Sequence, residues 1–387
     1  MTGDRASGWR HARLLSLLVL VGGLAVLGPG GSASAGSQAA NGRIAYVSDG
    51  ACRFDPALRN EDLFSMAPDG SGKADLSRNA NPDGAPAWSP DGTRLAFTRP
   101  GKGGNDDVFL MNANGKGQRN LTRTSPEDAN PDWTPDGSRV TYDVDGTQIF
   151  ALNADGSAMQ RLVPGGFAPA WAPSGQQIAY TQNVEPSNSE IFAANADGTG
   201  ARNLTNATSY DDDSAVWSPD GTKIAFTRFF GGAGEIYVMN ADGSGQTNLT
   251  NDPASDGEPT WSPDGTKIAF STNRGATGDT EIYVMNADGT NQVNLTNSPA
   301  NESDPDWAAA STVPAPKADK FCKVPNVAGL KLGAARGLFR KAGCAAGSVK
   351  YARSKRPRGR VVRQTPRKGL RLCFGVRVNV VVSRGLR

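Results

Sequence analysis

The chain has 387 residues and carries 41 Lys and Arg against 38 Asp and Glu, a net charge of +3 with histidine neutral. This length is enough to bury a full hydrophobic core and predicts more than one domain. The single histidine is His11, so loss of the first 35 residues would exclude a Ser-His-Asp triad, a histidine-ligated zinc site and a histidine general base. We therefore expect no catalytic residues, although Asp, Glu, Lys or Tyr keep an enzymatic alternative open.

The N-terminus has the layout of a secretory signal peptide. Three arginines precede the apolar run Leu14–Leu27, and the small residues Ala33, Ser34 and Ala35 follow it. This order predicts a signal peptide over residues 1–35, cleaved after Ala35. The apolar run is shorter than the roughly 20 residues that span a bilayer. We expect an exported protein of the cell envelope or medium, with no membrane span after cleavage; an uncleaved anchor is the alternative.

Most of the remaining chain is a repeat centred on tryptophan. Each period contains four short strand-like segments: one that ends at Trp, one of the type KIAFT, one of the type EIYVMNA and one of the type QTNLT. Pro-Asp-Gly and Asp-Gly turns separate them, and both provide the positive φ angles of tight hairpins. Four antiparallel strands in every 38 to 46 residues predict the blades of an all-β propeller. The repeat tryptophans are Trp88, Trp133, Trp171, Trp217, Trp261 and Trp307.

The two ends of the repeat predict a closed ring of six blades. The first period begins at Arg43 with a second strand, and Trp307 lies in a first strand that nothing follows. Placing the Trp307 strand in the first blade completes the ring over residues 42–310 and leaves no open edge. The stretches WSPDGTKIAFTR and EIYVMNADGSGQTNLT resemble the repeats of TolB-like propellers. The resemblance implies an exported platform that binds a protein or other ligand, here an unidentified protein or peptide.

Two recurring motifs are predicted to be structural. In Ser-Pro-Asp-Gly, Pro sets φ, Asp accepts hydrogen bonds from the turn and Gly adopts the left-handed conformation. The Asn-Leu-Thr triplets match a glycosylation acceptor, but they recur at one repeat position, which favours strand material. Those triplets begin at Asn120, Asn203, Asn248 and Asn294.

Acidic residues stand five positions before the tryptophan in five of the six repeats, and Gly166 takes this place in the sixth. This position precedes the strand expected nearest the propeller axis, so the carboxylates are candidates for a ligand-binding ring at the channel mouth. Such a ring suits a cationic peptide, a polyamine or Ca²⁺; no other cofactor or metal site is expected. Two alternatives remain open: each residue only caps its own loop, or the ring serves a hydrolase or lyase acting on wall carbohydrate or peptide. The candidates are Asp83, Asp128, Asp212, Asp256 and Glu302.

A second domain is predicted over residues 321–387, after a Pro- and Ala-rich linker at 311–320. A short strand at Val324–Val327 precedes a helix near 331–342, and strands follow near 348–353, 360–365 and 376–383, which gives a small α+β domain of order β-α-β-β-β. Val324–Val327, Gly329, Gln364 and the terminal run Val380–Ser383 resemble a PASTA domain. The resemblance implies binding to peptidoglycan and an anchor at the cell wall.

Charge is divided unequally between the two domains. Residues 317–387 contain 20 Lys and Arg and a single acid, Asp319, whereas residues 42–316 contain 18 basic and 36 acidic residues. A basic domain of this strength suggests a polyanion, and export favours an anionic wall polymer over nucleic acid. Docking on the acidic propeller and a merely solubilising surface are the alternatives. The candidate binding residues are Lys350, Arg353, Lys355, Arg356, Arg358, Arg360, Arg363, Arg367 and Lys368.

Export also permits disulfides. Cys322 and Cys344 flank the predicted helix and are the expected pair. Cys52 and Cys373 are left either to bridge the two domains or to stay free.

Overall fold

The structure is a computed structural model of the whole chain. It describes residues 39–49, 61–77, 79, 81–184, 188–207, 209–275, 278–298, 300–316, 322–342, 345–365, 368, 371–372 and 377–385. The predicted signal peptide lies outside the described residues, as do Cys52, Cys344, Cys373 and Arg367. Export and the Cys322–Cys344 disulfide therefore stay predictions.

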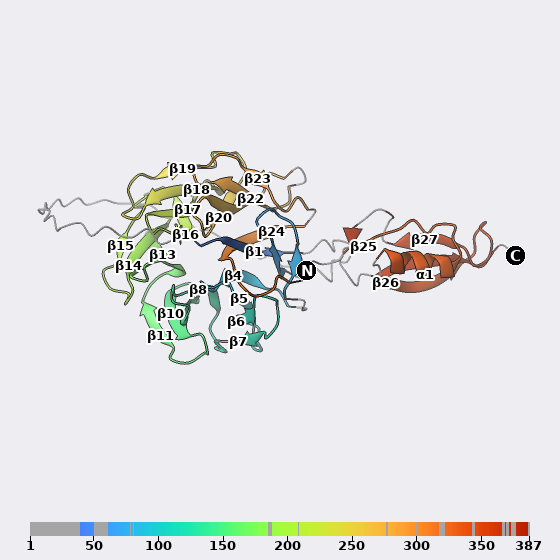
Figure 1. Ribbon diagram of the computed structural model, residues 1–387, viewed down its shortest axis with the longest axis horizontal. Coiled ribbons are helices and arrows are strands. Elements are labelled where there is room, and N and C mark those ends of the chain that lie inside the picture. Colours follow the sequence, from blue (N-terminus) through green and yellow to red (C-terminus); the bar gives the residue numbers. More distant parts are fainter. Residues whose placement is uncertain are drawn as a thin grey trace, which may run out of the picture.

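Six four-stranded antiparallel sheets are arranged around a common axis (Figure 1), and we number these blades 1 to 6 in chain order. From the axis outward, blade 1 contains β24 (Glu302–Ala309), β1 (Asn41–Ser48), β2 (Asp62–Met66) and β3 (Ala74–Asp75). Blade 2 contains β4 (Gly84–Trp88), β5 (Arg94–Pro100), β6 (Asp106–Asn112) and β7 (Arg119–Asn120). Blade 3 contains β8 (Asp128–Trp133), β9 (Arg139–Val144), β10 (Gln148–Asn153) and β11 (Gln160–Val163).

The second half of the ring repeats this order. Blade 4 contains β12 (Phe167–Trp171), β13 (Gln177–Val184), β14 (Asn188–Asn195) and β15 (Arg202–Asn203). Blade 5 contains β16 (Asp211–Trp217), β17 (Lys223–Phe230), β18 (Ala233–Asn240) and β19 (Thr247–Asn248). Blade 6 contains β20 (Asp256–Trp261), β21 (Lys267–Thr272), β22 (Glu281–Asn286) and β23 (Val293–Asn294).

The ring closes as the sequence predicts. Strand β24, which carries Trp307, pairs antiparallel with β1, and Trp307 lies opposite Ile44. The last strand of the propeller thus completes the first blade. The six-bladed fold is confirmed.

The hydrophobic core lies between adjacent blades. Ile224 and Phe226 of β17 are fully buried and pack towards blade 4, whereas Ala225 between them packs towards blade 6. The alternation expected of a strand covered on both faces is therefore confirmed. Burial of each large apolar side chain contributes about 1.5–3 kcal/mol.

Both recurring motifs have the structural roles expected of them. The Asp220 carboxylate accepts hydrogen bonds from the backbone N–H of Thr222 at 3.0 Å and from the Ser218 hydroxyl at 2.6 Å, and Gly221 has φ +69°. In the triplet of blade 5, the Asn248 side-chain oxygen accepts from the N–H of Thr250 at 3.0 Å. Ser-Pro-Asp-Gly is a turn, and Asn-Leu-Thr ends a blade.

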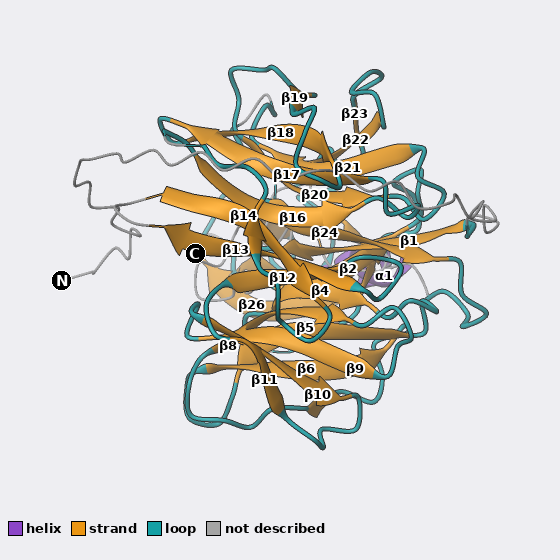
Figure 2. Cartoon of the chain, turned by 90° about the vertical axis from the view of Figure 1, so that its left-hand side faces the viewer, coloured by secondary structure: helices purple, strands orange, loops and turns teal. Residues whose placement is uncertain are grey.

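The C-terminal domain contains the only helix among the described residues (Figure 2). Helix α1 (Leu332–Lys341) covers a three-stranded sheet whose order is β26 (Ala345–Ala352), β29 (Arg377–Ser383) and β27 (Val361–Thr365). A short pair joins β25 (Cys322–Lys323) to β28 (Arg371–Leu372). Figure 1 places this domain beyond the ring, with β25 at the end nearer to it.

The strand expected at Val324–Val327 is not formed; the two residues before it form β25 instead. Pro325 lacks an N–H and cannot donate to a strand ladder. The Gln364 side chain replaces the ladder here. It accepts from the N–H of Val327 at 2.8 Å and donates to the Pro325 carbonyl at 2.9 Å.

Candidate functional site: the central channel of the propeller

Each first strand contains a bulge three residues before its tryptophan. In β16, the pairing with β17 shifts between Asp213 and Val216, and Ser214 between them has φ +56°. A left-handed backbone costs a residue with a side chain about 1–2 kcal/mol and persists only where its surroundings impose it. The same backbone recurs in all six first strands, at Ala85, Asn130, Ala168, Ser214, Glu258 and Asp304.

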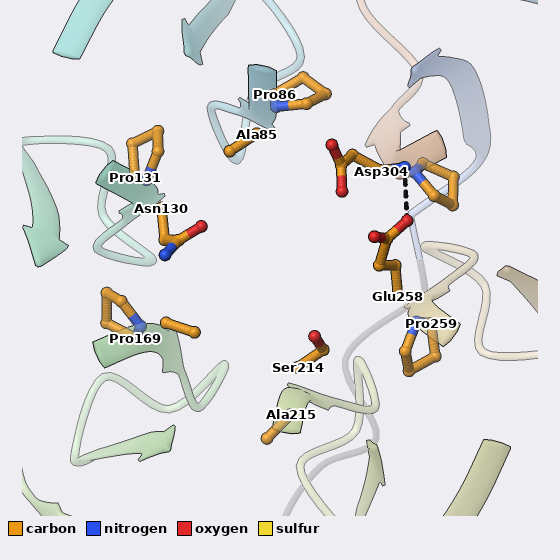
Figure 3. Close-up of a pocket in the computed structure, with 12 residues that line it drawn as sticks. Ala85, Pro86, Asn130, Pro131, Pro169, Ser214, Ala215, Glu258, Pro259 and Asp304 are labelled. Atoms are coloured by element: carbon orange, nitrogen blue, oxygen red, sulfur yellow. Dashed lines mark hydrogen bonds between the residues drawn. The ribbon is translucent and has the colours of Figure 1, made fainter. Parts of the chain in front are cut away.

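These bulges line a cavity of about 170 Å³ at the centre of the ring. All six blades contribute to it, each with the left-handed residue and the residue after it. That second residue is proline in every blade but blade 5, which has Ala215. Figure 3 shows the lining residues arranged around the empty centre. Because proline is rigid and apolar, the wall of the cavity is preformed. The residues with left-handed backbone supply the side chains that differ from blade to blade, so the choice of ligand depends on them.

The cavity is acidic on one side only. Glu258 and Asp304 lie next to each other on blades 6 and 1, with Asn130 across the cavity (Figure 3). The Glu258 carboxylate accepts from the backbone N–H of Asp304 at 2.8 Å and from the Ser271 hydroxyl at 2.6 Å. The other three left-handed residues are Ala85, Ala168 and Ser214, which carry no charge.

Asp304 holds its proton more tightly than an exposed carboxyl group does. Burial raises the pKa of Asp304 well above its usual value, and the neighbouring charge of Glu258 raises it further. Because two adjacent carboxylates repel, the position of Asp304 beside Glu258 favours the protonated form of Asp304. Two carboxyl groups side by side suit one ammonium or guanidinium ion. Among the described residues, no group of three or more His, Cys, Asp or Glu has the geometry of a metal site.

The predicted ring five residues before each tryptophan lies inside the blades. Its five acidic side chains are 0–4% exposed, and none of them lines the cavity. Asp212 is bound by Arg228 through two hydrogen bonds of 2.7 and 2.8 Å, and Asp83 by Arg99 through two of 2.5 and 2.9 Å. Asp256 is bound by Arg274. Binding of a ligand by this ring stays a prediction.

Asp128 and Glu302 occupy the same position without an arginine. Asp128 accepts from the Thr124 hydroxyl at 2.6 Å, and Glu302 from the Ser298 hydroxyl at 2.6 Å. One oxygen of each carboxyl group is buried with no hydrogen-bond partner. Burial raises the pKa of Glu302 to about 8. Asp128 and Asp256, two members of the ring on which the enzymatic alternative depends, are 0% and 1% exposed.

Sequence reasoning missed Glu258 and Asp304, although the repeat contained a signal. Proline follows the same position in five of the six first strands, and the residue at that position ranges from alanine to glutamate. A variable residue before a recurring proline, in the strand nearest the axis, indicates a ligand-facing position.

The candidate basic residues of the C-terminal domain are mostly solvent-exposed. Arg360 is half-buried, and its guanidinium donates to the Gly329 carbonyl at 3.0 Å. Tyr351, 53% exposed, lies among the basic residues. No Asp or Glu occurs between residues 321 and 387, so this surface carries an unbalanced positive charge. The exposed members are Lys350, Arg353, Lys355, Arg356, Arg358, Arg363 and Lys368.

Fold and sequence together define a six-bladed propeller joined to a small α+β domain. The family model for the TolB beta propeller domain matches residues 70–167 and 166–313, and the model for the PASTA domain matches residues 323–384. The chain belongs to the TolB beta propeller family and carries a PASTA domain at its C-terminal side.

Solved structures agree with this fold. TolB from Acinetobacter baumannii superposes with a TM-score of 0.59 at 22% identity, covering 70% of this chain and 67% of that one. A putative TolB from Agrobacterium tumefaciens gives 0.52 at 19% identity, covering 66% and 89%. Hydrazine synthase from Kuenenia stuttgartiensis gives 0.58 at 15% identity, covering 74% and 49%. At such identities the likeness concerns the fold alone. No curated protein matches the chain.

No helix among the described residues has the length and apolar character needed to cross a membrane.

Proposed function

We propose that this protein is a non-enzymatic binding protein of the cell envelope. Its propeller binds a cationic segment of a protein or peptide in the central channel, and its PASTA domain holds it on peptidoglycan or an anionic wall polymer. The observation that carries the proposal is the pairing, in one chain, of an acidic preformed channel with a basic domain that lacks carboxylates.

The channel supports a cationic ligand through its shape and its charge. Five prolines form a rigid wall, so little conformational entropy is lost on binding. Glu258 and Asp304 place two carboxyl groups at one side of the cavity. In a site this sheltered from solvent, a charge-assisted hydrogen bond to guanidinium or ammonium is about twice as strong as a neutral one.

The C-terminal domain supports attachment to a polyanion. Lys355, Arg356 and Arg358 are exposed in the loop between β26 and β27, and no acidic residue of the domain offsets them. The signal-peptide layout of residues 1–35 supports export to the compartment where wall polymers are found. Attraction of this kind weakens as salt shortens the Debye length.

Retention of the full chain without residues 1–35 on purified peptidoglycan tests the anchor. We expect retention at about 20 mM salt and at least tenfold less at about 500 mM. Changing Lys355, Arg356 and Arg358 to Gln should abolish most of it, whereas the matched change of Arg336, Arg340 and Lys341 on α1, also exposed, should have a smaller effect. Absence of retention at low salt would overturn the anchor.

A labelled peptide, Gly-Arg-Gly-Arg-Gly, tests the channel. We expect binding to weaken about tenfold when Glu258→Gln and Asp304→Asn are combined. The matched control, Asp155→Asn with Asp197→Asn, removes two carboxyl groups from exposed turns at the opposite end of the blades. Equal affinity in both double variants would contradict binding at the pair.

A further inference from the structure

The two domains are nearly equal and opposite in charge. Residues 42–316 have a net charge of −18 and residues 317–387 have +19. The excess negative charge of the propeller is concentrated on one face. We call this the mouth face: the end of each blade where its first strand begins, as β16 does at Asp211, and where its second strand ends, as β17 does at Phe230.

Acidic side chains dominate the mouth face. Among the described residues, Lys102 and Arg123 are exposed basic side chains there, and the exposed Arg161 reaches it by donating to Gln148 at the start of β10. The opposite face is mixed, because arginines such as Arg202 bind its turns; that guanidinium donates to the Ala241 carbonyl at 3.1 Å. Acidic residues on the mouth face or in the channel include Glu61, Glu127, Asp145, Asp211, Glu258 and Asp304.

The linker leaves the propeller at the opposite face, which carries the Pro-Asp-Gly and Asp-Gly turns and which we call the turn face. Strand β24 runs from Glu302 at the mouth face to Ala309 at the turn face. The backbone N–H of Ala310 donates to the Ala40 carbonyl at 2.7 Å, and Val313 packs against the core of blades 1 and 2. Pro316 still lines a cavity beside the Pro68 and Gly92 turns. The chain is therefore held on the turn face up to Pro316.

A domain tethered in this way cannot place its basic loop on its own mouth face. From Pro316 to Cys322 the chain reaches at most about 20 Å, and a domain of this size is about 25–30 Å across. To reach the mouth face, the domain would have to pass around the outside of the ring. That path runs outward across the width of a blade, roughly 15–20 Å, then along the length of the strands, about 25 Å, and then inward across the blade width again. The basic loop can therefore contact the acidic mouth face of a second molecule, but not the mouth face of its own chain.

The basic loop is presented for such a contact. In Arg353–Arg360 the side chains of Lys355, Arg356 and Arg358 are exposed. The base of the loop is held by Ser383, whose hydroxyl donates to the Arg356 carbonyl at 2.7 Å and accepts from the Ser354 hydroxyl at 2.8 Å. An ordered loop with three cationic side chains loses less entropy on binding than a free tail.

We propose that the mouth face of one molecule binds the basic loop Arg353–Arg360 of a second copy, so that the protein associates head to tail. The inference rests on the proposed function in one respect, that the channel accepts a cationic group. A head-to-tail contact uses two different surfaces, so each bound copy leaves one of each for the next.

Sedimentation of the full chain without residues 1–35 tests the inference. At about 20 mM salt we expect an average mass above that of the monomer which rises with concentration, and a return to monomer at about 300 mM. Glu258→Gln with Asp304→Asn, or Lys355, Arg356 and Arg358 to Gln, should each weaken association about tenfold. Asp155→Asn with Asp197→Asn should change it less than twofold.

A monomer at every concentration in low salt would overturn the inference, as would equal weakening by the control variant. Gly-Arg-Gly-Arg-Gly binding, measured in the same buffer, separates the two proposals. A monomer that binds this peptide through Glu258 and Asp304 leaves the proposed function intact and contradicts only self-association. A monomer that does not bind it contradicts both.

Discussion

Asp212 in blade 5 and Glu258 in blade 6 occupy positions of the repeat unit that are two residues apart, yet they lie in different surroundings. Asp212, five residues before its tryptophan, is fully buried within blade 5 and is bound by Arg228. Glu258, three residues before its tryptophan, lines the central cavity. The difference arises from the bulge, which turns the backbone to positive φ at Glu258 and directs its side chain to the axis. Acidity alone does not indicate a site; the local backbone decides what a carboxylate faces.

The largest expected effect follows from removing Arg228, the partner of the buried Asp212 carboxylate. Arg228→Met should lower the free energy of unfolding by about 3–5 kcal/mol, because it leaves Asp212 buried without its counter-charge. Adding Asp212→Asn should restore part of that loss. Urea denaturation measures both variants, and a loss below about 1 kcal/mol for Arg228→Met would show that the pair is not required.

Glu302 shows what happens where the repeat provides no arginine. Its pKa is raised to about 8, against about 4.3 in an unfolded chain. Between these values the folded state keeps a proton that the unfolded state has released, so the free energy of unfolding falls as pH rises from about 4 to about 8. Above about pH 8 the free energy of unfolding has fallen by the full amount that Glu302 contributes.

Glu302→Gln should remove this dependence. We expect the variant to exceed the parent in stability by about 2–3 kcal/mol at pH 9 and to match it near pH 4, since the carboxyl group is then neutral in both states. Denaturation across this pH range is the measurement. Parallel curves for the two proteins would show that Glu302 is already ionised at neutral pH.

The smallest expected effect concerns the channel position itself. Ala85 has φ +43°, a conformation that asparagine adopts more readily than alanine, and Asn130 stands at the same place in blade 3. Ala85→Asn should therefore raise the free energy of unfolding by about 0.5 kcal/mol. Ala308→Asn, at a buried position with ordinary backbone, should be destabilising instead. A destabilised Ala85→Asn variant would mean that the bulge is not held at this φ.

The ring and its closure were predictable because they depend on patterns that repeat. Spacing of the tryptophans, Asp-Gly turns and the lone Trp307 strand determine the number of blades and the partner of β1. The lining of the channel was not predictable in the same way. Its residues face the axis because a bulge interrupts the two-residue alternation of the first strand, and alternation was the basis of the prediction. Likewise, Arg228 lies opposite Asp212 only through a register that the pairing of β16 with β17 establishes.

The C-terminal domain shows the same limit on a smaller scale. Helical spacing of Leu332, Ala335 and Phe339 predicted α1 to within a residue or two. The segment Val324–Val327 looked like a strand because of its valines, but Pro325 prevents the ladder and a glutamine 37 residues away from Val327 provides the hydrogen bonds. Hydrogen bonds that a single side chain provides in place of a neighbouring strand leave no periodic signal in the sequence.

Proton release tests most directly whether a cation binds to the Glu258–Asp304 pair. Isothermal titration with Gly-Arg-Gly-Arg-Gly, repeated at one pH in buffers of different ionisation enthalpy, reports the protons exchanged on binding. A guanidinium beside the pair favours the ionised state of Asp304, whose pKa is raised. We therefore expect the protein to release protons to the buffer, and the Glu258→Gln, Asp304→Asn variant to release none. Peptide binding with the same affinity and the same proton release in that variant would place the cation elsewhere and contradict the account.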